Sequence, residues 1–168
     1  MTIALPKLIF VVYHAGPWLL GLVSTTTALG AIAGTLVIGQ ITRVGHRGAI
    51  AYLAMMLSSI GLIVFGLPFP LALRPWIACG AGILCGFSLS TFQIIWITLL
   101  QELVPTDKLG RVSSLDTLGS YSLLPVGLVV MGVLADHFGA AWVFIGGGVM
   151  LFCIVSVGLC LPDIRRLQ

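Results

Sequence analysis

Long stretches without a charged side chain dominate this chain of 168 residues. Only 8% of the residues are charged, 59% are hydrophobic, and the mean hydropathy is +1.17. Soluble domains carry roughly 25% charged residues, so the composition excludes an ordinary soluble fold. Each uncharged stretch can cross a bilayer, because about 20 helical residues span the hydrocarbon core. The stretches are Leu8–Thr42, Gly48–Leu73, Pro75–Gln101, Thr117–Ala135 and Phe138–Pro162.

These stretches predict an all-α, polytopic membrane helix bundle that occupies residues 1–168. The first stretch is long for one span, and His14, Gly16 and Pro17 indicate a helix break within it. Residues 1–13 are too short to span alone, so we interpret them as the remnant of a preceding helix. The expected spans are residues 18–41, 49–67, 76–100, 117–135 and 139–161.

A charged segment, QELVPTDKLGRVSSLD (Gln101 to Asp116), separates the third and fourth spans. We expect a loop there, with Pro105 and Gly110 in its turn, because water at the membrane surface solvates charges. Its acids are predicted to lie at the membrane boundary and therefore not to act as proton carriers in transport. The residues predicted for the cytoplasmic loops and gate are Arg43, Arg47, Glu102, Lys108, Arg111 and Asp116.

The basic residues predict the orientation. Lys7 and Arg74 fall on one side of the membrane, and Arg43, Arg47, Lys108, Arg111, Arg165 and Arg166 fall on the other. We expect the chain in the inner (plasma) membrane of the cell. The positive-inside rule then places the larger group, and the C-terminus, in the cytoplasm. Trp18, Trp76 and Trp142 then stand at outer span ends, where amphipathic rings favour the headgroups.

Several function classes are disfavoured. The basic residues are spread in pairs, whereas a nucleic-acid surface clusters them, so no nucleic-acid partner is expected. Ser88 has no histidine in a membrane core to act as its base, and the cysteines lack metal-ligand spacing. We predict no catalytic residue, cofactor or metal; a redox or metal pair of Cys153 and Cys160, seven residues apart, stays open as an alternative.

Small and polar residues recur along the spans. Gly30 and Gly34 in the first span, and Gly82, Gly86 and Ser90 in the third, repeat every four residues and predict close helix packing. Three spans also carry a polar stripe, which lines a shared cavity or, alternatively, bonds to carbonyls of its own helix. The stripes are Ser24, Thr27 and Thr35; Ser88, Thr91 and Thr98; and Thr117, Ser120 and Tyr121.

Three further residues stand out in the third and fourth spans. Gln93 and Trp96 are larger than packing needs and lie off the polar stripe of their span, so one is expected to face a neighbouring helix. Pro125 lies in the middle of the fourth span, where it removes a helical hydrogen bond. We predict a kink at Pro125, either static or used in gating.

The stretch from Thr98 to Gly139 resembles two helices, the tenth and eleventh, of major facilitator superfamily permeases. The likeness is to the bacterial efflux branch with the enterobactin exporter and macrolide efflux pumps. It rests on QELVPTDKLGRV (Gln101 to Val112), on PVG at Pro125 to Gly127, and on GVLADHFG (Gly132 to Gly139). Residues 20–41 resemble the eighth helix, and DIRRL (Asp163 to Leu167) resembles the end of the twelfth. One family signature is degraded: GQITRVGHRG (Gly39 to Gly48) lacks its aspartate.

The resemblance implies the C-terminal half of a twelve-helix permease, whose spans correspond to helices eight to twelve. It implies a secondary active transporter that exports a small amphipathic molecule by alternating access, coupled to protons, with a missing N-terminal half as partner. The predicted cavity residues are Ser24, Thr27, Ser88, Thr91, Ser120 and Tyr121. The alternative is a small integral membrane subunit without transport activity, or the remnant of a split or decayed gene.

Overall fold

The computed structural model describes residues 4–13, 16–40, 47–70 and 73–160. The helices are α1 (Ala4–Lys7), the π-helical turn η1 (Leu8–Val12), α2 (Pro17–Gln40), α3 (Arg47–Gly66), α4 (Arg74–Leu103), α5 (Thr106–His137) and α6 (Ala140–Cys160). The all-α prediction is confirmed, since the described residues contain no strand and include five helices long and apolar enough to cross a membrane.

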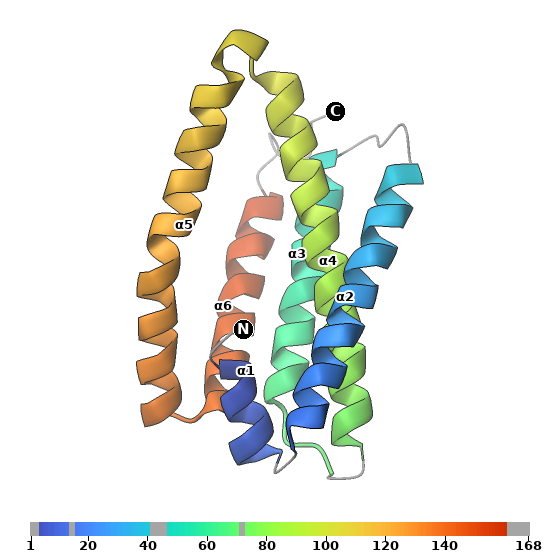
Figure 1. The fold of residues 1–168 in the computed structure, drawn as a ribbon, viewed down its shortest axis with the longest axis vertical. Coiled ribbons are helices and arrows are strands. Elements are labelled where there is room, and N and C mark those ends of the chain that lie inside the picture. Colours follow the sequence, from blue (N-terminus) through green and yellow to red (C-terminus); the bar gives the residue numbers. More distant parts are fainter. Residues whose placement is uncertain (1–3, 14–15, 41–46, 71–72, 161–168) are drawn as a thin grey trace.

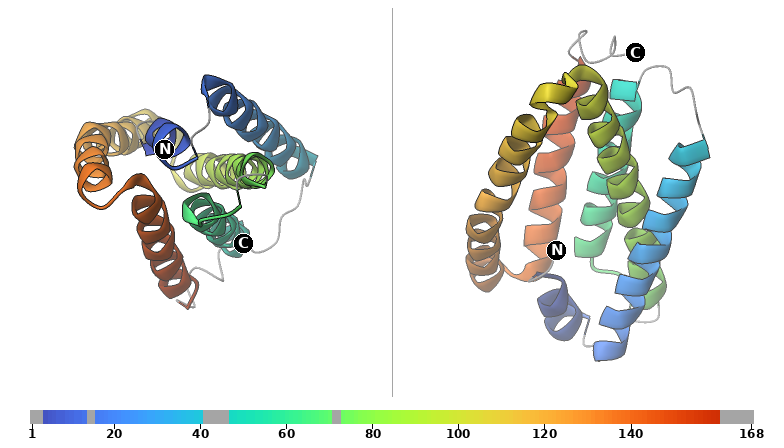
Figure 2. Two further views of the ribbon diagram at one scale, coloured as in Figure 1. Left: turned by 90° about the horizontal axis from the view of Figure 1, so that it is seen from below. Right: turned by 45° about the horizontal axis from the view of Figure 1, so that its top comes forward.

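The five long helices run up and down in alternation, and one of them stands apart (Figure 1). Helix α4 packs against α2 and α3, and α3 also packs against α6, whereas α5 touches the rest sparsely. In the apolar 18-residue stretch of α5 only 6% of the residues are buried, against 39% in the corresponding stretch of α3. Seen from below, α5 lies at one edge of the bundle, with α6 beside it and α1 between it and α4 (Figure 2).

Small residues allow α2 and α4 to pack closely, as their four-residue repeat predicted. A Cβ on Gly30 would clash with the backbone carbonyl of Ile83, and one on Gly86 would clash with that of Thr27. Without a hydrophobic drive between helices in lipid, such close contact supplies the van der Waals energy of association. We call this contact between α2 and α4 the glycine seam.

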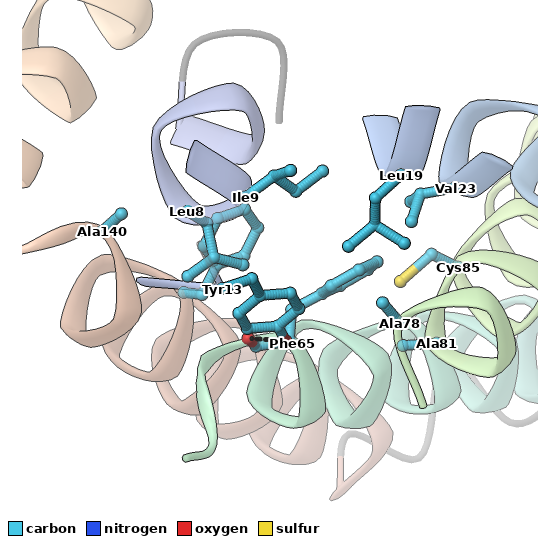
Figure 3. Packing of buried hydrophobic residues seen from close by; sticks show 11 residues of the cluster. Leu8, Ile9, Tyr13, Leu19, Val23, Phe65, Ala78, Ala81, Cys85 and Ala140 are labelled. Atoms are coloured by element: carbon cyan, nitrogen blue, oxygen red, sulfur yellow. Dashed lines mark hydrogen bonds between the residues drawn. The ribbon is translucent and has the colours of Figure 1, made fainter. Parts of the chain in front are cut away.

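The buried core lies near the end of the bundle that holds α1 and η1 (Figure 3). Leu8 and Ile9 of η1 pack there with Phe65 of α3 and with residues of α2 and α4. The Tyr13 hydroxyl donates a hydrogen bond to the Phe65 carbonyl at 2.9 Å, and the Arg74 guanidinium lies 5.6 Å from the centre of the Tyr13 ring. The short N-terminal helical segment is therefore an integral part of the fold.

The Lys7 ammonium fastens this segment to α5. It pairs with the carboxylate of Asp136 and donates a hydrogen bond to the Ala135 carbonyl oxygen at 3.0 Å. Both contacts lie at the last turn of α5. Helix α5 also contacts α6 and α4, so this pair adds to the sparse contacts that link it to the bundle.

The expected loop from Gln101 to Asp116 is wrong. Helix α4 continues to Leu103, α5 begins at Thr106, and only two residues join them. Val104 is extended because a residue before proline disfavours the helical region, and Pro105 then directs the chain into α5. Gly110 lies inside α5 and makes no turn. Most of the charged residues thus project from helix ends.

The predicted ends of the bundle agree with the arrangement of the helices. Trp18, Trp76 and Trp142 are exposed, and each lies in the first turn of α2, α4 or α6. These helices begin at one end of the bundle, and the joint between α4 and α5 lies at the other (Figure 1). Arg43 and the segment Asp163 to Leu167 lie outside the described residues, as does the predicted end of the last span.

Candidate functional site: a polar groove between α4 and α5

A groove of about 550 Å³ opens between α4 and α5, toward the end where these helices are joined. We call it the α4–α5 groove. Its polar lining residues are Gln93, Gln101, Ser113, Asp116, Thr117, Ser120 and Tyr121, and its apolar ones are Phe92, Trp96, Ile97, Leu100 and Leu109. Two further cavities, one between α6 and the helices α3 to α5 and one between α5 and α6, are almost entirely apolar.

Helical periodicity explains why these side chains meet. Ser113, Asp116, Thr117, Ser120 and Tyr121 follow one another at intervals of three, four, seven and eight residues from the first, which places them on one face of α5. The α4 lining residues form a broader face of that helix, at one, four, eight and nine residues from Phe92: Gln93, Trp96, Leu100 and Gln101. Polar residues at membrane depth face partners or water, so this pair of faces marks the polar interior of the bundle.

Asp116 and Trp96 connect the two walls. The indole Nε1 of Trp96 donates to a carboxylate oxygen of Asp116 at 3.5 Å, the long limit of a hydrogen bond. Trp96 also stacks on Phe92, with ring centres 6.2 Å apart and planes 15° from parallel. Trp96 is 44% exposed and Tyr121 is 69% exposed, so both rings remain accessible from the groove.

The six predicted cavity residues lie at different places in the described bundle, and their shared cavity stays a prediction. Ser120 and Tyr121 line the α4–α5 groove, as predicted for the fourth span. Thr27 lies beside Gly82 and Gly86 in the glycine seam, and Ser24 is exposed on α2. Ser88 and Thr91 are buried on α4, away from the lining of the groove. The stripes of α2 and α4 therefore do not join that of α5 here.

Most hydroxyl groups of the α2 and α4 stripes bond to carbonyls of their own helix, which is the alternative to a cavity lining. Ser24, Thr27 and Ser88 each donate a hydrogen bond to the carbonyl oxygen four residues earlier, at 2.7 to 2.8 Å. These bonds satisfy the hydroxyls within their own helices, so they need no cavity. Within the stripes of α2 and α4 the exception is Thr91, whose Oγ1 is buried and has no hydrogen-bond partner within the described part of the chain.

The residues predicted for the cytoplasmic gate separate into two groups. Glu102, Lys108 and Arg111 are exposed near the joint of α4 and α5, while Asp116 is half-buried in the groove. Arg47 begins α3. Asp116 lies within helix α5 and not in an irregular loop; its place at the membrane boundary stays a prediction.

Pro125 lies inside α5, which continues without a break to His137. The helix therefore tolerates the lost hydrogen bond, as helices in a bundle commonly do. The predicted kink at this position stays a prediction. Among the described residues, no cluster of three or more potential metal-ligating side chains is present.

The sequence predicts that Gln93 or Trp96 faces a neighbouring helix, and both line the groove opposite α5. It does not predict that Asp116 joins them, because it places Asp116 in a loop. The signal that finds them is a comparison of helix faces once α5 is extended back to Thr106. Asp116 then falls on the same face as Ser120 and Tyr121.

Comparison with known proteins agrees with this architecture. The family model of the Major Facilitator Superfamily matches residues 1–166. The chain belongs to this superfamily. As a member of this family of transporters it is a multi-pass membrane protein, and its five long apolar helices match that assignment.

Two curated relatives are named for macrolide efflux. Macrolide efflux protein A of Streptococcus pyogenes is 27% identical over 156 residues, which are 93% of this chain and 38% of that protein. The protein of the same name from a serotype M6 strain gives the same values. The chain thus spans well under half the length of these relatives. No solved structure matches it.

Proposed function

We propose that this chain is the C-terminal half of a secondary active exporter, which moves a small amphipathic molecule by alternating access coupled to protons. The observation that carries the proposal is the family match over almost the whole chain, together with relatives named for macrolide efflux. The α4–α5 groove is the proposed substrate-facing surface. It is about as large as a typical small-molecule site of roughly 300 to 1,000 Å³, and it combines apolar and polar walls.

The proposed partner is an N-terminal half that completes the permease. Superfamily permeases combine two six-helix halves, and the substrate site lies between them near the middle of the bilayer. The sparse packing of α5 fits this arrangement, because a helix that borders a second half needs few contacts within its own half. The small-molecule substrate would then lie between the α4–α5 groove and the partner half.

We place the chain in the cell inner membrane with its C-terminus in the cytoplasm. Lys108 and Arg111 support this orientation, because they lie near the joint of α4 and α5, opposite the exposed tryptophans. In this placement the Lys7–Asp136 pair lies at the outer surface and Glu102 at the inner one. The lipid bilayer covers the apolar outer faces of the helices.

Transport by proteoliposomes tests the proposal. The chain is reconstituted alone and together with the N-terminal half of a macrolide efflux relative, and uptake of a radiolabelled macrolide is followed after a proton gradient is imposed. We expect uptake only when both halves are present and only with the gradient. Flux from this chain by itself would contradict the requirement for a partner, and no flux from any combination would contradict the exporter proposal.

The second candidate is a membrane subunit without transport activity or a gene remnant. The DNA upstream of the coding sequence discriminates between the two. An in-frame or adjacent reading frame that encodes about six spans supports a split or longer permease; no such frame supports the second candidate.

A further inference from the structure

We propose that the α4–α5 groove binds amphipathic organic cations, with Asp116 as the anionic acceptor and Trp96 and Tyr121 as aromatic walls. This inference names the substrate class of the proposed exporter and rests on that function. It assigns Asp116 to the lining of the groove and not to an irregular loop. The argument depends on depth, charge and the surrounding rings.

The first step is the depth of Asp116. Helix α5 has 32 residues, which is about 48 Å at 1.5 Å per residue, against about 30 Å for the hydrocarbon core. The uncharged stretch Thr117–Ala135 is by itself about 28 Å long, so a core placed on it leaves Asp116 directly at its end. The carboxylate therefore lies at the edge of the hydrocarbon region, half-buried in the groove, where a partner stabilises its charge.

The second step is the charge of the groove. Asp116 is its one charged lining residue, and no Lys, Arg or His is among the described residues that line it. Trp96 donates a long hydrogen bond of 3.5 Å to the carboxylate, which leaves most of the acceptor capacity of Asp116 unused among the described residues. The groove thus has a net negative charge and lacks a counter-ion of its own. A ligand with a positive charge would satisfy both conditions.

The third step is the aromatic wall. Trp96 and Tyr121 are both exposed to the groove, and Phe92 stacks on Trp96 and supports its ring. An ammonium group over such rings gains cation–π energy, and the apolar part of the same ligand gains contact area. Gln93 and Ser120 add hydrogen-bonding groups nearby. An acid with adjacent rings therefore favours an organic cation over a neutral or anionic molecule.

Two ions of equal shape and opposite charge test the proposal. The 168-residue chain is placed in lipid nanodiscs, and the binding of tetraphenylphosphonium and tetraphenylborate is measured by equilibrium dialysis after subtraction of binding to empty nanodiscs. Asp116→Asn removes the charge with little change in shape. Asp107→Asn is the matched control, because Asp107 is exposed in the first turn of α5 and outside the groove.

We expect saturable binding of tetraphenylphosphonium that Asp116→Asn weakens about tenfold or more, a change that corresponds to about 1.4 kcal/mol. Asp107→Asn should leave it unchanged, and tetraphenylborate should bind poorly to every variant. Equal binding of the two ions, or equal affinity of the Asp116→Asn variant and the original chain for the cation, would overturn the proposal. The absence of saturable binding would also overturn the proposal, and it would indicate that helix packing closes the groove.

A second variant covers the case in which Asp116→Asn fails to fold as judged by gel filtration. Trp96→Leu keeps the acid and removes the ring, and it should weaken the binding of tetraphenylphosphonium several-fold; unchanged binding would count against the site. Dialysis at several pH values distinguishes a cation acceptor from a residue that only carries protons. If Asp116 only carried protons, Asp116→Asn would leave the affinity for the cation unchanged at every pH. Cation binding without macrolide transport would contradict the exporter proposal and leave this site intact.

Discussion

Helix α4 packs against α2 through the glycine seam and faces α5 across the α4–α5 groove. In the seam, Gly82 and Gly86 bring two backbones together, and their hydroxyl neighbours bond within their own helices. In the groove, large side chains such as Trp96 and Tyr121 keep the helices apart and leave polar groups exposed. Residue size on one helix thus separates a surface for stability from a surface for binding.

The largest expected effect comes from filling the glycine seam. Gly86→Leu should prevent close packing of α2 and α4, because the added atoms meet the backbone of Thr27 and Ala31, which cannot move aside as a side chain can. We expect a loss of about 3 kcal/mol or more in stability, or no folded protein. Gel filtration and thermal unfolding in detergent measure it.

The control for this prediction is on the same helix. Gly80→Leu should have little effect, since nothing lies within 4 Å of a Cβ at Gly80. Equal damage from both substitutions would show that helix propensity and not the seam decides the outcome. Equal tolerance would show that α2 and α4 do not pack closely in the bilayer.

A smaller and opposite effect is expected at Thr91. Its side chain is 3% exposed, and its Oγ1 has no partner in the described part of the chain. Thr91→Val removes the buried hydroxyl and keeps the shape, so stability should rise by about 1 kcal/mol. Ser88→Ala is the comparison, because the Ser88 hydroxyl donates to the Leu84 carbonyl; a gain at both sites would contradict the distinction.

The link between α1 and α5 should contribute less. Lys7→Gln removes the ion pair with Asp136, which is well exposed, and retains a group that can donate to the Ala135 carbonyl. Exposed ion pairs are weak and are screened by salt. We expect a small fall in the unfolding temperature that disappears in high salt. A fall of the same size at all salt concentrations would indicate a role for Lys7 other than charge.

The groove itself should tolerate change without loss of stability. Ser120→Leu should alter the stability by no more than about 0.5 kcal/mol, because the side chain lies in open space on α5. It should nevertheless reduce the room for a ligand. Ser122→Leu, also exposed but outside the groove lining, is the matched control. Binding lost equally in both variants would contradict the assignment of the site to this face.

Some features of the bundle could be predicted well because they depend on local chemistry. The uncharged stretches predicted five apolar helices, and the repeats of Gly30 with Gly34 and Gly82 with Gly86 predicted close packing. The site was harder, because a polar stripe such as Ser24 and Thr27 has the same pattern whether it lines a cavity or bonds to its own helix. The hydrogen bonds of these hydroxyls distinguish the two cases.

The sequence alone determined that this protein lies in a membrane, that it is helical and that it resembles a permease family. These properties depend on hydropathy and motifs, which can be read from residues close together in the chain. Only the tertiary structure decided which helix faces meet. It extended α5 back to Thr106, placed Asp116 opposite Trp96, and separated Ser120 from Thr27. The reason is geometric: each residue turns a helix by about 100°, so the partners of a side chain depend on where its helix begins and which neighbour it faces.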